Sequence, residues 1–204
     1  MSTFLERPTE KLVKDYIEIF KNDQRYYPAD NAIINLFKVF PHNTKIEDIL
    51  LKISVLNDLY STNIFATFDL AKHILSLNID LKLAAGDTTA VKEIATGHGI
   101  ISSKNNREIT FYSFATKYCN WHNQENYAIY DSFVEKVLMA YKKQDSFASF
   151  RKDDLKSFSR FKSIIEEFTS YYNLTRFSLK EMDKFLWVLG KEKFPTNYKQ
   201  KEKK

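Results

Sequence analysis

The chain has few of the residues that build tight turns and covalent cross-links. Its 204 residues include only four glycines, four prolines and one cysteine, Cys119. So few turn-forming residues argue against a β-sandwich or β-barrel, in which tight turns recur between short strands. A single cysteine excludes a disulfide within the chain and a four-cysteine zinc or iron–sulfur site. This cysteine content is compatible with a reducing compartment, and we expect a cytoplasmic location.

Long apolar runs and metal-binding patterns are also missing. No run of about 18 apolar residues occurs, so we expect no membrane partner. The first residues, MSTFLERPTEKL, lack the apolar centre of a signal peptide. Metal-binding helices carry histidines at fixed spacing with an acidic partner, and no such spacing occurs among the four histidines. They are His42, His73, His98 and His122. We therefore expect no metal and no cofactor.

The positive charge of the chain is concentrated at its carboxyl end. Residues 191–204 hold six lysines against two glutamates, a net charge of +4, so the first 190 residues carry only +1 of the total of +5. The body of the protein is therefore not strongly basic. We predict a single globular domain over residues 1–190, followed by a flexible lysine-rich tail over residues 191–204.

Apolar and aromatic residues are abundant and recur at helical spacing. They make up 44% and 15% of the chain, enough for a substantial core. The repeated spacing predicts about nine helices, and no segment alternates as a strand would. Capping signals at Thr9, at Thr44 with Glu47 and at Ser178 with Glu181 mark helix starts. We therefore predict an all-α fold of many helices in two lobes with a cleft, and the polar residues 144–152 are the candidate seam.

Residues 110–141 are the most informative segment. They predict two amphipathic helices joined by a polar turn, with Asp131 where the second helix begins, just before a capping-box pattern at Ser132 and Glu135. A carboxylate in that place is either an ordinary helix cap, which stabilises by about 0.5–1 kcal/mol, or the working acid of a site. Both interpretations remain open from these residues.

Two other candidate sites are weaker. Cys119 and His122 stand three residues apart on one predicted helix, as a nucleophile and its base could. No third group that would orient them is visible, so a buried core cysteine is the favoured interpretation. The glycine pair Gly97 and Gly99 has no phosphate-loop pattern around it and is read as a helix stop.

The order of elements around Asp131 resembles that of the helix-hairpin-helix DNA glycosylases. The matching layout is the connector 102–107, the helix 110–122, the turn 123–128 and then Ile129, Tyr130 and Asp131. In that family a hairpin between two helices holds the DNA backbone, and an essential aspartate begins the next helix. The resemblance covers roughly residues 45–141. It implies a helix-hairpin-helix glycosylase-like fold, DNA as the partner, and a hydrolase of DNA repair.

The resemblance also implies residue roles. Asp131 would be catalytic, because a fixed carboxylate stabilises the sugar cation that forms when an N-glycosidic bond breaks, or activates a water. The DNA backbone would contact the connector residues Lys104, Asn105, Asn106 and Arg107. The flipped base would enter a pocket. The expected pocket residues are Asn57, Asp58, Tyr60, Asn63, Trp121 and Tyr130.

The sequence departs from the family pattern in two places. The connector lacks the glycines that let backbone N–H groups approach phosphate. The helix start at residues 110–113 lacks the lysine that bifunctional members use as a nucleophile, and Lys117 is expected mid-helix, on the face opposite Phe114 and Tyr118. These departures favour a monofunctional glycosylase that uses the aspartate alone.

Two alternatives belong to other classes. The same scaffold could serve as a catalytically inactive module that binds nucleic acid or protein. Alternatively, the chain is an unrelated helical bundle in which Asp131 only caps its helix. No feature of the sequence specifies an oligomeric state.

Overall fold

The computed structural model describes residues 4–195, and within them the protein is all-α, as the sequence predicts. Ten α-helices and one 3-10 helix form, and these residues contain no β-strand, only an isolated bridge between Ile101 and Glu108. The elements are α1 (Glu10–Asn22), α2 (Tyr26–Val39), α3 (Ile46–Leu59), α4 (Thr67–Ser76), α5 (Asp80–Ala85), α6 (Thr89–Ala95), α7 (Tyr112–His122), α8 (Ser132–Asp145), η1 (Lys152–Lys156), α9 (Phe158–Tyr171) and α10 (Leu179–Lys193). The sequence analysis missed α5, which is too short to show a helical period.

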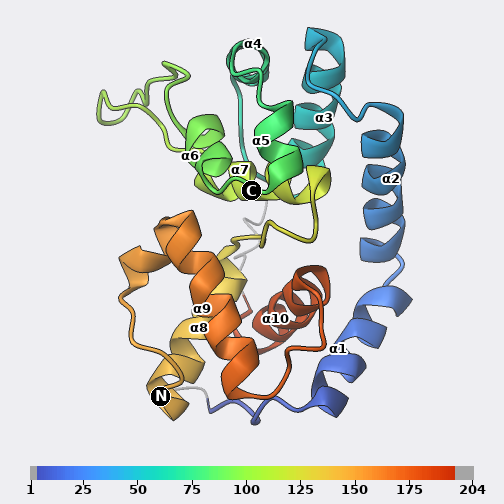
Figure 1. Ribbon diagram of the computed structural model, residues 1–204, viewed down its shortest axis with the longest axis vertical. Coiled ribbons are helices and arrows are strands. Elements are labelled where there is room, and N and C mark those ends of the chain that lie inside the picture. Colours follow the sequence, from blue (N-terminus) through green and yellow to red (C-terminus); the bar gives the residue numbers. More distant parts are fainter. Residues whose placement is uncertain (1–3, 196–204) are drawn as a thin grey trace, which may run out of the picture.

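The helices gather in two groups (Figure 1). Helices α3 to α7 lie together in one group, α1, α8, α9 and α10 lie in the other, and α2 runs along the side. Helix α10 packs against both α1 and α8, while α3 packs on α4 and α6 on α7. The chain crosses from the first group to the second through residues 123–131, which lead from α7 into α8. Residues 144–152, the predicted seam, connect α8 to η1.

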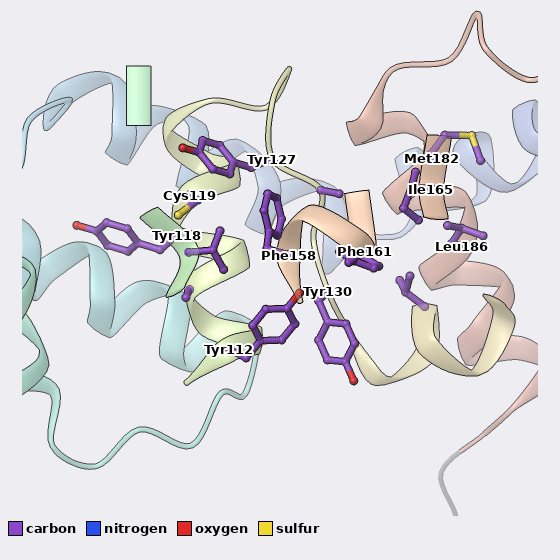
Figure 2. Packing of buried hydrophobic residues seen from close by; sticks show 14 of the residues in the cluster. Tyr112, Tyr118, Cys119, Tyr127, Tyr130, Phe158, Phe161, Ile165, Met182 and Leu186 are labelled. Atoms are coloured by element: carbon purple, nitrogen blue, oxygen red, sulfur yellow. The ribbon is translucent and has the colours of Figure 1, made fainter. Parts of the chain in front are cut away.

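Aromatic side chains fill the core where the two groups meet. Figure 2 shows Phe158 and Phe161 of α9 between the tyrosines around α7 and the side chains of Met182 and Leu186. The rings of Tyr127 and Phe158 lie 5.6 Å apart, in a tilted pair. Cys119 is fully buried in this core, and burial raises the pKa of its thiol well above the usual range. The cysteine therefore stays protonated and behaves as a small apolar residue, as the favoured interpretation predicts.

The capping signals were right at some helix starts. Thr9 caps α1, and Ser178 with Glu181 forms the predicted capping box at α10. The box predicted from Thr44 and Glu47 is wrong, because α3 begins without a side-chain cap.

Part of the predicted tail is wrong as well. Residues 191–193 belong to α10, and the ammonium of Lys191 lies over the rings of Tyr26 and Trp187, at 4.5 Å and 4.6 Å from their centroids. These contacts extend the folded body past residue 190. Residues 196–204 of the predicted tail lie outside the described residues.

A buried polar network ties the loop before α3 to the helices around it. Lys52 is fully buried, and its ammonium donates hydrogen bonds to His42 O (2.9 Å) and Asn43 Oδ1 (2.7 Å). Asn43 Oδ1 also accepts a bond from Tyr118 Oη (2.5 Å), and its amide nitrogen donates to Asp80 Oδ1 (2.6 Å). The network therefore joins α3, α5 and α7 through one asparagine.

His122 lies at the edge of this network, and its imidazole is a titratable group. Its Nε2 lies 3.3 Å from Asn43 Nδ2 and 3.4 Å from Lys52 Nζ, which are both donors, so the nitrogen is an acceptor and carries no proton. Burial, with the nearby charge of Lys52, lowers the pKa of His122 to about 3. A buried neutral histidine destabilises the fold in acid, because the unfolded chain takes up the proton first.

We expect His122→Asn to flatten the acid dependence of stability. The folded pKa of about 3 lies below the ordinary value of 6.5, so wild-type stability falls as the pH drops through that window. The slope is about 1.4 kcal/mol per pH unit for one proton. Urea denaturation at several pH values between 4 and 7 measures it. The control His42→Asn removes an exposed imidazole and should keep the steep dependence; parallel curves for His122→Asn and wild type would contradict the assignment.

Glycine commonly follows the end of a helix, so the sequence predicts that Gly190 stops the last helix, but its role in the structure is different. It lies inside α10, where the first turn of α8 comes so close that an added Cβ would stand 2.7 Å from Phe133 Cβ and 2.8 Å from Phe133 O. The glycine is therefore needed for the contact between the two helices and does not end α10, which continues to Lys193.

The sign of the stability change in Gly190→Ala tests this contact. Helix propensity alone would stabilise α10 by about 1 kcal/mol, whereas overpacking against main-chain atoms costs about 1–3 kcal/mol. We expect net destabilisation of about 1 kcal/mol in urea denaturation. Lys143→Ala, at an exposed position of α8, is the control and should change stability by less than about 0.5 kcal/mol. A stabilised Gly190→Ala variant would show that the helices can move apart.

Candidate active site

Asp131 both caps its helix and forms a charge pair. Its backbone is extended (φ −141°, ψ 155°), and Oδ1 accepts a hydrogen bond of 2.9 Å from the backbone N–H of Phe133. The cap interpretation is therefore correct, and Asp131 occupies the cap position in place of the predicted Ser132. The other oxygen, Oδ2, lies 3.6 Å from Lys117 Nζ. The Asp131 side chain is 20% exposed, so this carboxylate is held at the edge of the core and can be reached from solvent.

Lys117 is buried beside this carboxylate. The face of α7 opposite Phe114 and Tyr118, on which Lys117 is expected, is buried as well, because α7 is buried on all sides: Tyr112 and residues 114–121 are all buried. Its ammonium donates hydrogen bonds to Ser113 Oγ (2.6 Å) and to Tyr130 O (3.1 Å). Burial lowers the pKa of Lys117, and the charge of Asp131 opposes that effect. The lysine therefore gives up its proton more readily than one in water.

Helix α10 adds further charges next to this pair. The ammonium of Lys180 lies 3.9 Å from a carboxylate oxygen of Asp183 and 3.7 Å from one of Asp30, and Lys184 lies 3.0 Å from Asp30. Burial raises the pKa of Asp183 to about 6, although the charge of Lys180 opposes it. The charge of Lys117 also acts on Asp183, which places both groups in one electrostatic environment.

We call these six side chains the charged cluster. Its members come from α2, α7, α10 and the start of α8: Asp30, Lys117, Asp131, Lys180, Asp183 and Lys184. Three are cations and three are anions, so the cluster is neutral when all six are ionised. Grouped ionisable side chains under burial are a common property of active sites, since burial and mutual charge shift their pKa values.

Two predicted pocket residues form an aromatic wall of the cluster. Trp121 Nε1 donates a hydrogen bond of 3.1 Å to the hydroxyl of Tyr60. The ammonium of Lys180 lies 4.0 Å from the centroid of the Trp121 ring, and that of Lys117 lies 5.3 Å from the Tyr60 ring. Burial raises the pKa of the Tyr60 phenol, and nearby carboxylates add to the effect. Tyr60 therefore stays neutral and can act as a hydrogen-bond donor.

The side chain of Tyr130 points away from this wall. Its hydroxyl donates a hydrogen bond to Glu135 Oε2. Its ring packs edge-on against Phe161, and the two residues lie side by side in Figure 2. Only the carbonyl of Tyr130 faces the charged cluster, where it accepts the bond from Lys117.

The remaining predicted pocket residues lie in and around the loop after α3. Asn57 Oδ1 accepts from the backbone of Ile64 (2.8 Å), and Asn63 has a left-handed backbone with φ 56°. These two residues hold the loop in shape. Asp58 is exposed near the end of α3.

The predicted DNA-binding residues lie on an exposed hairpin. The chain between α6 and α7 folds back through the Ile101–Glu108 bridge, and all four predicted residues there are exposed: Lys104, Asn105, Asn106 and Arg107. At the base of the hairpin, Glu108 Oε1 accepts from Gly99 N (2.8 Å) and the carboxylate also accepts from Gly97. These bonds lower the pKa of Glu108, and they engage two glycine amides that an external anion would otherwise meet.

A surface hollow of about 660 Å³ lies between α4 and this hairpin. His73, Lys72 and Gly97 are among its lining residues, and Asp131 is not. Among residues 4–195, no group of three or more His, Cys, Asp or Glu side chains is arranged to hold a metal ion. Within the same residues, no helix combines the length and apolar character needed to cross a membrane.

The sequence analysis missed the contribution of α10. Lys180, Asp183 and Lys184 stand at positions i, i+3 and i+4, which on a helix form one charged face. Such a face is usually solvated, and nothing in its composition marks it as buried. A helical-spacing argument could have placed the three together, but not against Asp30 and Trp121.

The chain is similar to one protein family and to a bacterial protein. The family model HI_0787_N, described as an N-terminal domain, matches residues 12–126, more than half of the chain. A protein of Haemophilus influenzae described as uncharacterized is 46% identical over 154 residues, which cover 75% of this chain and 71% of that protein. No solved structure matches the chain. The matched family region includes Lys117 and ends just before Asp131.

Two substitutions at Asp131 should show how much its cap bond contributes to stability. Asparagine keeps a cap oxygen, whereas alanine removes it, so we expect Asp131→Ala to be less stable than Asp131→Asn by about 1 kcal/mol at neutral pH. Urea denaturation measures the difference. The same two substitutions at the exposed Asp58 are the control and should be indistinguishable within about 0.5 kcal/mol. Equal stability of the two Asp131 variants would argue against the cap.

Proposed function

This chain belongs to the HI_0787_N family, and we propose that it removes a base from DNA by cleaving an N-glycosidic bond. The observation that carries the proposal is the pair of Asp131 and Lys117: a partly exposed carboxylate 3.6 Å from a buried amine, beside an aromatic wall. The hairpin that precedes α7 supports it, because helix, hairpin, helix and aspartate follow in the order that the resemblance requires. On this proposal, the two helix groups act as lobes around DNA.

Asp131 supplies the negative charge that the reaction needs. Loss of a base leaves positive charge on the sugar, and a fixed carboxylate stabilises that charge without reorganising. The N-terminus of α8 favours an anion at this position through its aligned backbone dipoles. Because Oδ1 is held by the cap bond, Oδ2 is the oxygen available to the sugar.

Lys117 adds a nucleophile that the sequence analysis did not expect. A lysine whose pKa is lowered by burial supplies the neutral amine that attacks an electrophilic carbon. In the proposed reaction the neutral Nζ forms a bond to C1′ of the sugar, and the base leaves with the electron pair of the glycosidic bond and takes the proton that the nitrogen loses. We therefore propose the covalent mode in place of the aspartate-only mode, which rests on the absence of a lysine at residues 110–113 and on the expected position of Lys117 on another face of the helix.

The aromatic wall and the hairpin would hold the nucleic acid. A base taken out of the stack needs a planar partner, and Trp121 and Tyr60 supply one next to Asp131. The ammonium of Lys180 lies on the Trp121 ring, so a base that stacks there displaces it. Lys104 and Arg107, exposed on the hairpin, would contact backbone phosphates.

The test is borohydride trapping on a panel of duplex oligonucleotides, each with one deaminated, oxidised, alkylated or abasic site. We expect a covalent cross-link at Lys117, identified by peptide mass, and base release by the wild-type protein. Lys117→Gln should abolish the cross-link, and Asp131→Asn should slow base release at least about 100-fold. Lys136→Gln, an exposed lysine of α8, is the matched control and should react like wild type.

Two other outcomes of the trapping experiment are informative. Base release without a cross-link would support the aspartate-only mode. No base release from any oligonucleotide would contradict the proposed function.

A second candidate is a nucleic-acid-binding module without chemistry. The contact of Glu108 with the amides of Gly97 and Gly99 counts against substrate positioning by the hairpin backbone, and it leaves the exposed side chains of Lys104 and Arg107 for non-specific contact with phosphates. Salt-dependent DNA binding without base release would be its signature.

A further inference from the structure

We infer that Ser113 of α7 is a positioning residue, which holds the amine of Lys117 so that its lone pair points at the sugar. The inference rests on the proposed function and deepens it, because it explains how one buried amine is aimed at C1′. Ser113 is the second residue of α7 and stands one helical turn before Lys117. It is partly exposed, so it lies at the edge of the core, as Asp131 does.

The ammonium of Lys117 has its shortest contacts with two fixed acceptors. Nζ donates hydrogen bonds to Ser113 Oγ at 2.6 Å and to Tyr130 O at 3.1 Å. A longer contact of 3.4 Å joins Nζ to the main-chain carbonyl of Ser113, and Asp131 Oδ2 lies farther away, at 3.6 Å. Because an ammonium has three N–H bonds, the third is left to point toward Asp131.

The hydroxyl of Ser113 acts as an acceptor toward Lys117 because its own proton is engaged elsewhere. Ser113 Oγ donates a hydrogen bond of 3.1 Å to Tyr130 O, which leaves its lone pairs for the amine. Ser113 Oγ, Tyr130 O and Lys117 Nζ therefore form a closed triangle of hydrogen bonds. A hydroxyl that is held in this way has a fixed orientation and so fixes the direction of the N–H bond that it accepts.

The carbonyl of Tyr130, which is the second acceptor, is held by the same helix. Thr116 Oγ1 accepts a bond from the backbone N–H of Tyr130 (3.1 Å) and donates one to the carbonyl of Ser113 (2.9 Å). Ser113, Thr116 and Lys117 stand at positions i, i+3 and i+4, so one face of α7 binds both the N–H and the C=O of Tyr130. Asp131 is the next residue in the chain, and these bonds hold it beside Lys117.

These contacts aim the amine when it has lost one proton. A neutral amine has two N–H bonds and one lone pair. When the N–H bonds stay on Ser113 Oγ and Tyr130 O, the lone pair takes the third direction, beside Asp131 Oδ2. The amine then faces the sugar carbon to which it forms a bond, and the carboxylate stabilises the positive charge of the same sugar. Without the hydroxyl, the amine can turn, and its lone pair is aimed at C1′ for only part of the time.

The experiment is the pH profile of the borohydride-trapping rate at saturating duplex, for wild type, Ser113→Ala and Ser113→Thr, on the oligonucleotide that wild type processes fastest. The rate should rise with pH as Lys117 loses its proton and then reach a plateau, where the amine is neutral. We expect Ser113→Ala to lower this plateau about tenfold, because the orientation of the amine is lost. Ser113→Thr keeps a hydroxyl and should restore most of the rate.

Protonation and orientation change different parts of this profile. Because a hydrogen bond to the charged form raises the pKa of an amine, its loss in Ser113→Ala should also move the midpoint to lower pH. The charged and aromatic groups that face the amine are the same in all variants: Asp131 of α8, Asp183 and Lys180 of α10, and the ring of Tyr60. A shifted midpoint with an unchanged plateau would show that Ser113 affects only the charge of Lys117, which would overturn the inference.

The matched control is Ser54→Ala, at an exposed serine of α3 whose hydroxyl also bonds to the carbonyl four residues earlier. It should react like wild type at every pH. The affinity of Ser113→Ala for the duplex, measured by fluorescence anisotropy, should be unchanged, because Ser113 acts through Lys117. A loss of affinity with no change in the plateau would assign Ser113 to DNA binding and contradict the positioning role.

The remaining outcomes separate this role from space filling and from failure of the proposed function. A plateau for Ser113→Thr as low as that of Ser113→Ala would show that the hydroxyl is not what matters. If Ser113→Ala does not fold, Ser113→Cys takes its place, since a thiol is a weak acceptor. A lowered plateau for this variant supports the role, and a wild-type plateau contradicts it. Wild-type protein that never forms a cross-link would refute the covalent mode and the inference with it, whereas a cross-link that is equally fast in Ser113→Ala would refute the inference alone.

Discussion

The contact between Lys117 of α7 and Asp131 at the start of α8 is the interaction on which fold and site both depend. Burying an ammonium costs free energy unless it is paired and hydrogen-bonded. The ammonium of Lys117 donates hydrogen bonds to Ser113 and to the carbonyl of Tyr130, and it is paired with the carboxylate of Asp131. Ser113 lies on α7 before residues 123–131, where the chain passes between the two helix groups, and Tyr130 and Asp131 end that segment. The crossing is therefore stabilised by the side chains to which we assign chemistry.

The two buried lysines Lys52 and Lys117 have different surroundings, and we assign a structural role to the first and a catalytic role to the second. Lys52 is bonded to a carbonyl and an amide inside a closed network, and burial lowers its pKa to about 8. Lys117 is paired with a carboxylate that reaches solvent and adjoins further buried charges. Replacing a buried ion pair by apolar residues is often stabilising, so a cluster of six charges is poorly explained by stability alone. The position of Lys117 next to Asp131 and an aromatic wall makes it the better candidate for catalysis.

Much of the fold could be predicted from local patterns, and the failures have physical causes. Thr9 and Ser178 cap their helices as expected, because a cap depends on residues within one turn. Gly190 was read as a stop because glycine commonly follows helix ends, whereas it serves here for the approach of Phe133, which is distant in sequence. Of the expected pocket, Tyr60 and Trp121 reach the charged cluster, while Tyr130 turns its ring to Phe161. A helical period does not show which neighbour a side chain will meet.

The sequence by itself determined that the chain is helical and that Asp131 begins a helix, because helical spacing and end signals act over a few residues. Only the tertiary structure decided that α7 is buried on every side, which places Lys117 against Asp131. It also decided that the charged face of α10 meets Asp30 and Trp121 and is mostly covered. A run of charged residues at helical spacing has the same appearance whether solvent or another helix covers it, and packing between distant segments makes the choice.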